Sequence, residues 1–284
     1  ATYMYSGMVD VAALTNDKNY VEAVDHIWEN VVSKKIYITG GIGAKAQGEA
    51  FDQNYKLPNI KAYNETCAAI GNIFWNHRLF LLHGDSKYID VLERTIYNGF
   101  LSGISLDGKK FFYPNPLASS GYHVRTEWFE CACCPSNIVR LIASISGYVY
   151  AQHDDTLYVN LFVSNTAAIS IDENIVSITQ DTEYPWDGII KITVNLQKNL
   201  DFNIAIRIPG WMQNQPVPSD LYHYLKKIDE KVGLKVNGKP IEIICEKGYT
   251  HISRRWKDGD IIELDFPMTI RRVLAYEKIK EDNG

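Results

Sequence analysis

Three of the chain's five cysteines, Cys131, Cys133 and Cys134, lie within four positions in the stretch FECACCPSN. A bridge between the neighbours Cys133 and Cys134 would be badly strained, and an odd number of cysteines does not suit a disulfide framework. The thiolate form of cysteine is both a metal ligand and a nucleophile. The cluster therefore indicates a metal site or a reactive thiol rather than a crosslink.

A second group of ligand-type residues lies upstream in YNETCAA, as Glu65 and Cys67. On a regular helix, residues i and i+2 point about 200° apart, so both reach one metal only where the backbone is irregular. The start of a helix, with Asn64 as the expected N-cap, provides such a place. Zinc binds thiolates, imidazoles and carboxylates in a tetrahedron. We therefore predict a zinc site formed by Glu65, Cys67, Cys133 and Cys134.

The paired cysteines have three readings on sequence grounds. They can hold a purely structural zinc, or they can be buried thiols without a ligand, because a free cysteine packs well as a small apolar side chain. They also stand before a helix expected to begin near Pro135, where the positive end of the helix dipole and a bound metal would both favour a thiolate. Such a thiolate can act as a nucleophile if an acid lies beside it.

The preferred acid is Glu49, in the glycine-rich loop AQGEAFD, and the alternatives are Glu127 and Glu130, which flank the cysteines. Tyr113, in YPNPL, can donate a hydrogen bond to the same site, and His123 is the histidine nearest the cluster in sequence. Most loop glutamates are merely solvated and most tyrosines are packed rings, so these roles depend on the residues meeting in space.

Two further segments have a simpler interpretation. GGIGA, residues 40–44, has too few ordered glycines for a dinucleotide or phosphate-binding loop and is expected to form a tight turn. Cys245, in the strand-like run IEIICEKG, is expected to be buried and structural.

Helical periodicity dominates the first 150 residues. Apolar residues recur at helical spacing in KNYVEAVDHIWENVVSKK, and SGMVDVAALTND, ETCAAIGNIFWNHRLFLLHG, SKYIDVLERTIYNGFLSGIS and NIVRLIASISGYVY also read as helices. Paired helices with candidate functional residues in their loops favour a helical array or an α/α barrel over a parallel sheet. We assign residues 1–150 to this helical region.

The period changes near residue 150. TLYVNLFVSNTAAI, IVSITQDT, GIIKITVNL, FNIAIRIPGW, YTHISRRW and DIIELDFPM are short runs rich in Val, Ile and Thr with turn residues between them. Regular spacing of this kind predicts an antiparallel β-sandwich over residues 151–284. The chain is thus predicted to be an α + β multidomain protein. QNQPVPSD, residues 213–220, is expected to be a surface loop.

Composition restricts the partners and the compartment. The net charge of −5 argues against a nucleic-acid or anionic-membrane surface, and no apolar run approaches the roughly 20 residues that span a bilayer. Unpaired cysteines favour a reducing cytoplasm, although metal-bound thiolates survive elsewhere. Because the chain begins mid-helix without a Met, a targeting signal can lie upstream, which leaves a periplasmic or secreted protein open.

The motifs occur in an order that resembles one family. TGGIGA…GEAF, NETCA, YPNPL, ECACCPSN, IRIPGW and GD-x-I-x-L-x-F-P-M together resemble glycoside hydrolase family 127, the β-L-arabinofuranosidases. The resemblance covers residues 1 to about 275, and the NETC and ACCPSN pair is its most specific part. It implies an (α/α)6 barrel followed by β-sandwich modules.

The resemblance also implies roles for the residues. Zn²⁺ would be held by Glu65, Cys67, Cys133 and Cys134, with Cys133 as the nucleophile and Glu49 as the acid/base. Tyr113 matches a tyrosine near the thiolate, and we add His123 as a candidate substrate contact. The implied reaction is retaining, exo-acting hydrolysis of a terminal furanoside in an oligosaccharide or glycan.

The chain also departs from the family pattern. Family members have a long N-terminal part that supplies about half of the barrel helices, so we expect residues 1–150 to be the C-terminal half of an incomplete barrel. Two alternatives stay open, namely a non-catalytic carbohydrate-binding or scaffold protein with a structural zinc, and a related glycosidase with a different sugar specificity. The sequence is also compatible with a homodimer.

Overall fold

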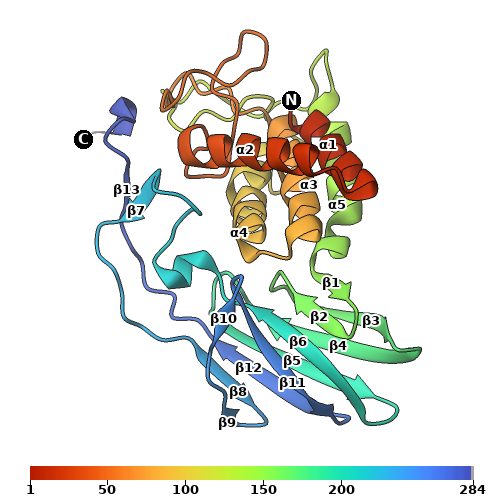
Figure 1. Cartoon of the computed structure of the whole chain (residues 1–284). Coiled ribbons are helices and arrows are strands. Elements are labelled where there is room, and N and C mark those ends of the chain that lie inside the picture. The colour runs from red at the N-terminus through yellow and green to blue at the C-terminus, as the bar shows by residue number, and fades with distance from the viewer. Residues whose placement is uncertain (283–284) are drawn as a thin grey trace. The chain divides into compact units, whose positions relative to one another are not determined.

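The computed structural model describes residues 1–282 and separates into two compact units. The first comprises residues 1–144, together with 215–225 and the chain from residue 273, and the second comprises residues 145–214 and 226–272. Both helices and sheets are present, as the predicted α + β class requires (Figure 1). Within the described residues, no helix is both long and apolar enough to cross a membrane.

Five α-helices build most of the first unit, and each corresponds to a periodic segment of the sequence. A π-helical turn and a short 3₁₀ turn follow the fourth helix directly. The apolar periodicity of this segment did not indicate the change of helix type. The helices are α1 (Thr2–Thr15), α2 (Lys18–Lys34), α3 (Thr66–His83), α4 (Ser86–Arg94) and α5 (Cys133–Ser144), with the π-helix at Thr95–Phe100 and the 3₁₀ turn at Leu101–Gly103.

Helix α3 forms the centre of this unit because it is apolar on every side. It packs against α1, α4 and α5, and its Ile70, Ile73 and Trp75 are fully buried. Helix α2 instead has one apolar face, on which Val24 and Trp28 are buried. The Trp28 indole N–H donates to Asn76 Oδ1 over 2.7 Å, so the tryptophan's polar atom is satisfied inside the core. This packing holds α3 in place, and the ligand-type residues lie at its N-terminal end.

The second unit contains two β-sheets that bury one common hydrophobic cluster. Buried side chains from both sheets contribute to it, among them Ile204 and Trp256 from one sheet and Ile178 and Ile192 from the other. The first sheet has the order β1 (Tyr150–His153), β2 (Thr156–Val159), β6 (Leu200–Arg207), β11 (Tyr249–Trp256), β10 (Cys245–Glu246), and the second has the order β3 (Asn165–Ile171), β4 (Asn174–Thr182), β5 (Ile189–Leu196), β12 (Asp260–Asp265), β8 (Gly233–Val236), β9 (Lys239–Pro240).

One strand pair departs from the antiparallel arrangement that the sequence predicts. Strands β2 and β6 pair in parallel, with Leu157 opposite Ile204. Between them the chain leaves for the other sheet and forms β3, β4 and β5 before it returns, and a long crossover of this kind is what a parallel pair needs. The other strand pairs of the two sheets are antiparallel.

Two segments from the C-terminal half belong to the first unit, although the sequence analysis assigns all of 151–284 to the sandwich. They form the small sheet of β7 (Tyr222–Tyr224) and β13 (Val273–Ala275). Ser219 donates to the carbonyl oxygen of Val32 over 2.9 Å, and Val217 is only 2% exposed. The prediction of a surface loop at 213–220 is therefore wrong for Val217, since the turn residues there cover the end of α2.

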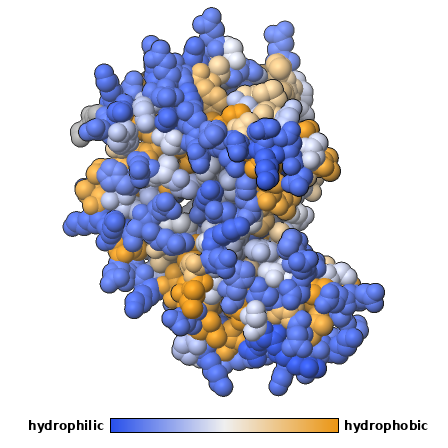
Figure 2. Space-filling view, viewed as in Figure 1, coloured by the Kyte–Doolittle hydropathy of each residue, from blue (hydrophilic) through white to orange (hydrophobic). Residues whose placement is uncertain are grey.

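Polar and apolar side chains share the surface. The face drawn in Figure 2 is mainly hydrophilic, with separate hydrophobic patches among the polar side chains. Small patches of this size are normal on a globular protein and need no special explanation.

Candidate active site

Two helix N-termini bring the four predicted ligand residues together. Glu65 occupies the N-cap position of α3 with ψ 137°, outside the helical region, and Cys67 is the second helical residue. The backbone irregularity that lets Glu65 and Cys67 face the same point is therefore present, although the cap lies one residue later than the predicted Asn64. Cys133 and Cys134 are the first residues of α5, which begins two residues before the predicted Pro135.

The four donor atoms form one compact group. They all lie within 4.8 Å of one another, each residue contributing one carboxylate oxygen or sulfur. Cys67 Sγ is 3.5 Å from Cys134 Sγ, and Cys133 Sγ is 3.8 Å from Cys134 Sγ. Glu65 Oε1 lies 3.5 Å from Cys133 Sγ and 4.0 Å from Cys134 Sγ.

These separations match the requirements of a tetrahedral metal ion. A zinc–sulfur bond of about 2.3 Å places neighbouring donors roughly 3.8 Å apart at the corners of a tetrahedron. The measured distances of 3.5 to 4.0 Å fall around that value. Three of the four residues are buried and Cys133 is partly exposed. The donor set thus fits a divalent cation that binds thiolates.

Without a nearby positive charge, burial makes it costly to ionise the acidic groups of this cluster. It raises the pKa of the Glu65 carboxyl, and it raises the pKa of the Cys133 thiol to about 12. The pKa of Cys67 is also raised, first by its hydrogen bond with Cys134 and then by burial. Acidic groups whose pKa is raised in this way can still ionise around a cation, because metal binding and deprotonation are coupled.

One neighbour supports the cluster from outside the donor set. Asn137, one turn along α5, donates from Nδ2 to Cys67 Sγ over 3.1 Å. Hydrogen bonds of this kind orient a metal ligand. Asn137 was not singled out from sequence, although its place in the CCPSN motif, three residues after Cys134, puts it on the same face of the helix.

Glu49 meets two tyrosines at the edge of the site. The hydroxyl groups of Tyr63 and Tyr113 both donate to Glu49 Oε1, over 3.0 and 2.9 Å. Glu49 is exposed and has φ +47°, so its loop presents it in a left-handed turn. Tyr63 was missed by the sequence analysis, and its position two residues before Glu65 is the only signal that would have suggested it.

Tyr113 lies near both this carboxylate and the cysteines. Its hydroxyl donates to Glu49, and its presence lowers the pKa of the Cys133 thiol, while burial raises that pKa more. The pKa of Tyr113 itself is raised, chiefly by burial and then by Cys133 and Glu49. The tyrosine therefore remains a hydroxyl donor that lies between a carboxylate and a thiol.

The remaining candidates lie apart from this group. His123 stacks on Phe112 with ring centroids 4.4 Å apart, and its Nε2 donates to the carbonyl oxygen of Pro114 over 2.9 Å. Cys131 is exposed and is not one of the four grouped donors. Exposed side chains are also found at Glu127 and Glu130. Cys245 is exposed rather than buried, because β10 is a two-residue strand at the edge of its sheet.

Family models match both halves of the chain. Residues 3–147 match the model described as "Beta-L-arabinofuranosidase, GH127 catalytic domain", and residues 156–268 match "Beta-L-arabinofuranosidase, GH127 middle domain". A curated relative, the non-reducing end β-L-arabinofuranosidase of Bifidobacterium longum subsp. longum, is 33% identical over 298 residues, which cover 99% of this chain and 42% of the relative.

Solved structures give the same picture. A GH127 β-arabinofuranosidase is 55% identical with a TM-score of 0.98, and the match covers 100% of this chain and 45% of that one. A GH127 β-L-arabinofuranosidase from Geobacillus stearothermophilus is 41% identical with a TM-score of 0.89, over 99% and 44% of the two chains. The chain thus spans less than half the length of these relatives. Over that span it belongs to glycoside hydrolase family 127.

Proposed function

We propose that the protein carrying this chain is a retaining, exo-acting glycoside hydrolase that releases a terminal β-L-arabinofuranose from a glycan. The observation that carries the proposal is the convergence of Glu65 and three cysteines within 4.8 Å, with the Tyr113 hydroxyl donating to Glu49. The relatives are named as β-L-arabinofuranosidases, which supports the choice of sugar.

The four grouped donors would hold zinc. When bound there, the cation would supply positive charge that keeps the Cys133 sulfur ionised at neutral pH. Cys133 is the natural nucleophile among the three cysteines because it is partly exposed, whereas Cys67 and Cys134 are buried. Substrate can therefore reach its sulfur.

The first half of the reaction displaces the leaving group. The Cys133 sulfur attacks the anomeric carbon and forms a C–S bond while the glycosidic C–O bond breaks. Glu49 gives its proton to the departing oxygen, which leaves as an alcohol. Tyr113 orients the Glu49 carboxyl through the hydrogen bond from its hydroxyl.

The second half releases the sugar from sulfur. Glu49, now a carboxylate, takes a proton from water, and the water oxygen attacks the anomeric carbon as the C–S bond breaks. Two displacements at the same carbon retain its configuration. A thiolate thus replaces the second carboxylate that most retaining glycosidases use.

We also propose the finer architecture that the family implies. The helical unit would be part of an (α/α)6 barrel, and the two sheets would form a β-sandwich module. The substrate would be an oligosaccharide or glycan, which Tyr113 contacts at the site.

Replacing the nucleophile tests the proposal directly. Cys133→Ser should abolish turnover of an aryl β-L-arabinofuranoside, while three donors of the set still retain some metal. A cysteine-directed sugar analogue should give a mass adduct on Cys133 in the unmodified protein and none in the variant. Full activity of the variant would exclude Cys133 as the nucleophile, and a protein with bound metal but without adduct or turnover would instead be a scaffold.

The acid is tested by the choice of leaving group. Glu49→Gln should slow substrates with poor leaving groups by roughly 10²–10⁴-fold, because these need a proton on the departing oxygen. An activated aryl glycoside should be slowed far less in that step. Equal losses on both substrates would argue against an acid role for Glu49.

A further inference from the structure

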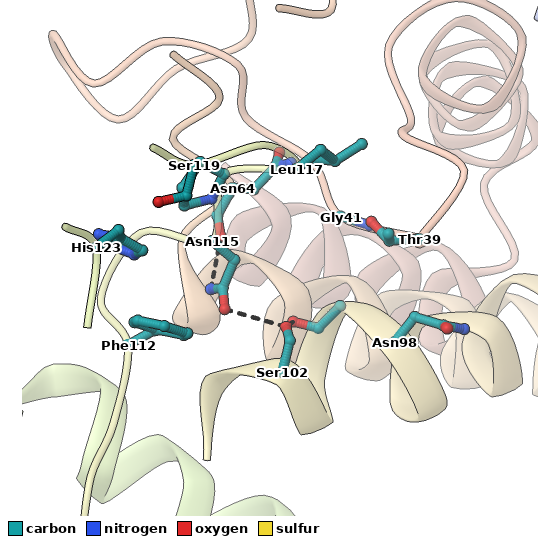
Figure 3. Close-up of a pocket in the computed structure, with 12 residues that line it drawn as sticks. Thr39, Gly41, Asn64, Asn98, Ser102, Phe112, Asn115, Leu117, Ser119 and His123 are labelled. Atoms are coloured by element: carbon teal, nitrogen blue, oxygen red, sulfur yellow. Dashed lines mark hydrogen bonds between the residues drawn. The ribbon is translucent and has the colours of Figure 1, made fainter. Parts of the chain in front are cut away.

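A separate pocket of about 360 Å³ lies in the first unit, with Asn64 in its wall (Figure 3). Its wall combines Thr39, Asn98, Ser102 and Asn115 with the Phe112 ring. The volume is at the lower end of the range for small-molecule sites. None of the four grouped donors, nor Glu49 or Tyr113, is among its twelve lining residues.

The amide of Asn64 is the unusual feature of this pocket. Asn64 is 3% exposed and lines the pocket, yet its Nδ2 and Oδ1 have no hydrogen-bond partner among the described residues. An unpaired buried amide costs on the order of 1–3 kcal/mol. The neighbouring Asn115, by contrast, is satisfied, since its Nδ2 donates to the Asn64 carbonyl oxygen over 3.0 Å and its Oδ1 accepts from Ser102 (Figure 3).

The backbone around the pocket is specialised as well. Asn98 and Gly99 lie in the π-helix Thr95–Phe100, and π-helical turns are frequent at functional sites. Gly99 allows a close approach, because a Cβ there would lie 3.2 Å from the backbone nitrogen of Gly41. The irregular helix thus brings the Asn98 side chain to the pocket wall, whereas a regular helix would place this side chain elsewhere.

The wall itself carries no charged side chain, although Arg125 packs on the Phe112 ring and donates to the Ser102 carbonyl oxygen. No Asp, Glu, Lys or Arg is among the lining residues. His123 donates from Nε2 to a carbonyl oxygen, so in its neutral form Nδ1 is an acceptor. The wall therefore offers amides, hydroxyls and one imidazole acceptor beside the apolar faces of Phe112 and Leu117. Such a wall suits a neutral molecule with several hydroxyl groups and C–H faces.

We propose that this pocket binds a neutral, hydroxyl-rich ligand, a single sugar unit or a polyol of similar size, as a site separate from the cysteine cluster. An amide presents a donor and an acceptor side by side, and two adjacent hydroxyl groups present the complementary pair. Asn64 would pair with such a diol and so satisfy both of its unpaired atoms. The inference rests on the lining alone and stands whether or not the chain hydrolyses glycosides.

The test uses L-arabinose as the probe on the full-length protein that carries this chain. Crystals soaked in L-arabinose should show the sugar in this pocket, with a hydroxyl group on the Asn64 amide. In calorimetric titrations, Ser119→Trp should weaken this binding at least ten-fold, since Ser119 is exposed at the wall and a large ring there fills the space. Ser120→Trp is the matched control, because Ser120 is also exposed but does not line the pocket, and it should bind as the unmodified protein does.

A second variant removes the recognition group itself. Asn64→Gly suits the φ of +41° at this position and deletes the unpaired amide, so sugar binding in the pocket should fall at least ten-fold. A sugar acid should bind at least ten-fold more weakly than L-arabinose. If the pocket holds only water in soaked crystals, or if Ser119→Trp binds L-arabinose like the unmodified protein, the inference is overturned.

Two further experiments complete the test. One distinguishes a unit of a glycan from a free sugar, and the other distinguishes failure of the pocket proposal from failure of the proposed function. An arabinose disaccharide that binds at least ten-fold more tightly than L-arabinose identifies a unit of a glycan, and equal binding identifies a free sugar; either result supports the site. Binding in this pocket should persist in Cys133→Ser. Loss of the proposed hydrolysis with retained binding would count against the function only, and the reverse would count against the pocket only.

Discussion

The Nδ2 group of Asn137 donates to Cys67 Sγ over 3.1 Å from one turn inside α5. Cys67 itself belongs to α3, so this hydrogen bond crosses between the two helices that supply the donors. Asn137 carries no charge and is not one of the four grouped metal-ligand residues. Its effect on the site is to orient the Cys67 sulfur. Outer partners of metal ligands usually change affinity without changing the ligand set.

Removing this hydrogen bond should weaken the metal site. Asn137→Ala should lower zinc affinity by about 10–100-fold, because Cys67 loses both its orientation and a donor to its negative sulfur. Competition with a coloured zinc chelator measures the change. Val139→Ala is a suitable control, since Val139 is on the same helix and 67% exposed, and it should leave the affinity unchanged. An affinity equal to that of the unmodified protein would show that Asn137 has no part in the site.

At the scale of elements, Gly40 holds the glycine-rich turn against the helix that follows α4. Its φ is +80°, and a Cβ there would lie 2.5 Å from Thr95 Oγ1 and 2.7 Å from the Thr95 Cα. The backbone of Thr95 begins the π-helix that forms part of the pocket. A side chain at residue 40 would therefore have to displace a backbone, not a flexible side chain.

A pair of glycine substitutions separates this contact from backbone strain. Gly43→Ala should cost about 1–2 kcal/mol, because its φ is +86° and nothing lies within 4 Å of the added Cβ. Gly40→Ala should cost roughly 2–5 kcal/mol, since the overlap with Thr95 adds to the same strain. Urea unfolding of both variants measures the difference. Equal losses would mean that the close approach to Thr95 carries no energy.

The helices and the donor group could be predicted from sequence because each depends on local pattern or on ligand chemistry. The periodicity of α2 and α3 marks a buried face, and thiolates beside a carboxylate in two helix-start motifs indicate a metal. These signals do not require knowledge of distant contacts. They gave the starts of α2 to α5 to within about two residues, as at Cys133, whereas α1 begins at Thr2, before the predicted Ser6, and α5 ends at Ser144, before the predicted Tyr150.

The features that were missed depend on contacts distant in sequence. Val217 reads as part of a polar loop, but it is buried in the folded chain, where the nearby Ser219 donates to Val32 of α2 from 187 residues away. The parallel pairing of β2 with β6 follows from the path of three intervening strands. The unpaired amide of Asn64 and the hydrogen bond from Tyr63 to Glu49 likewise depend on loops that meet only in the folded chain.

At the scale of the molecule, the two units have different sources of stability. The second unit buries a large aliphatic and aromatic cluster that includes Phe202, Trp256 and Ile262. The first unit contains every one of the four grouped donors, and these tie α3 to α5. Because a ligand that binds only the folded state stabilises it by mass action, metal should stabilise the first unit specifically.

Removal of metal should therefore loosen one unit and leave the other unchanged. After chelation, hydrogen exchange should speed up at least ten-fold for amides at the starts of α3 and α5, since three thiols and the Glu65 carboxyl, whose pKa burial raises, then face one another without a cation. Amides of β5 and β12 should exchange at their original rates, measured by mass spectrometry of the same samples. Cys245→Ser, a thiol removed from the second unit, should respond to chelation like the unmodified protein. Equal acceleration in the sheets would show that the metal stabilises the whole chain, and no change at α3 or α5 would mean that these donors hold no metal.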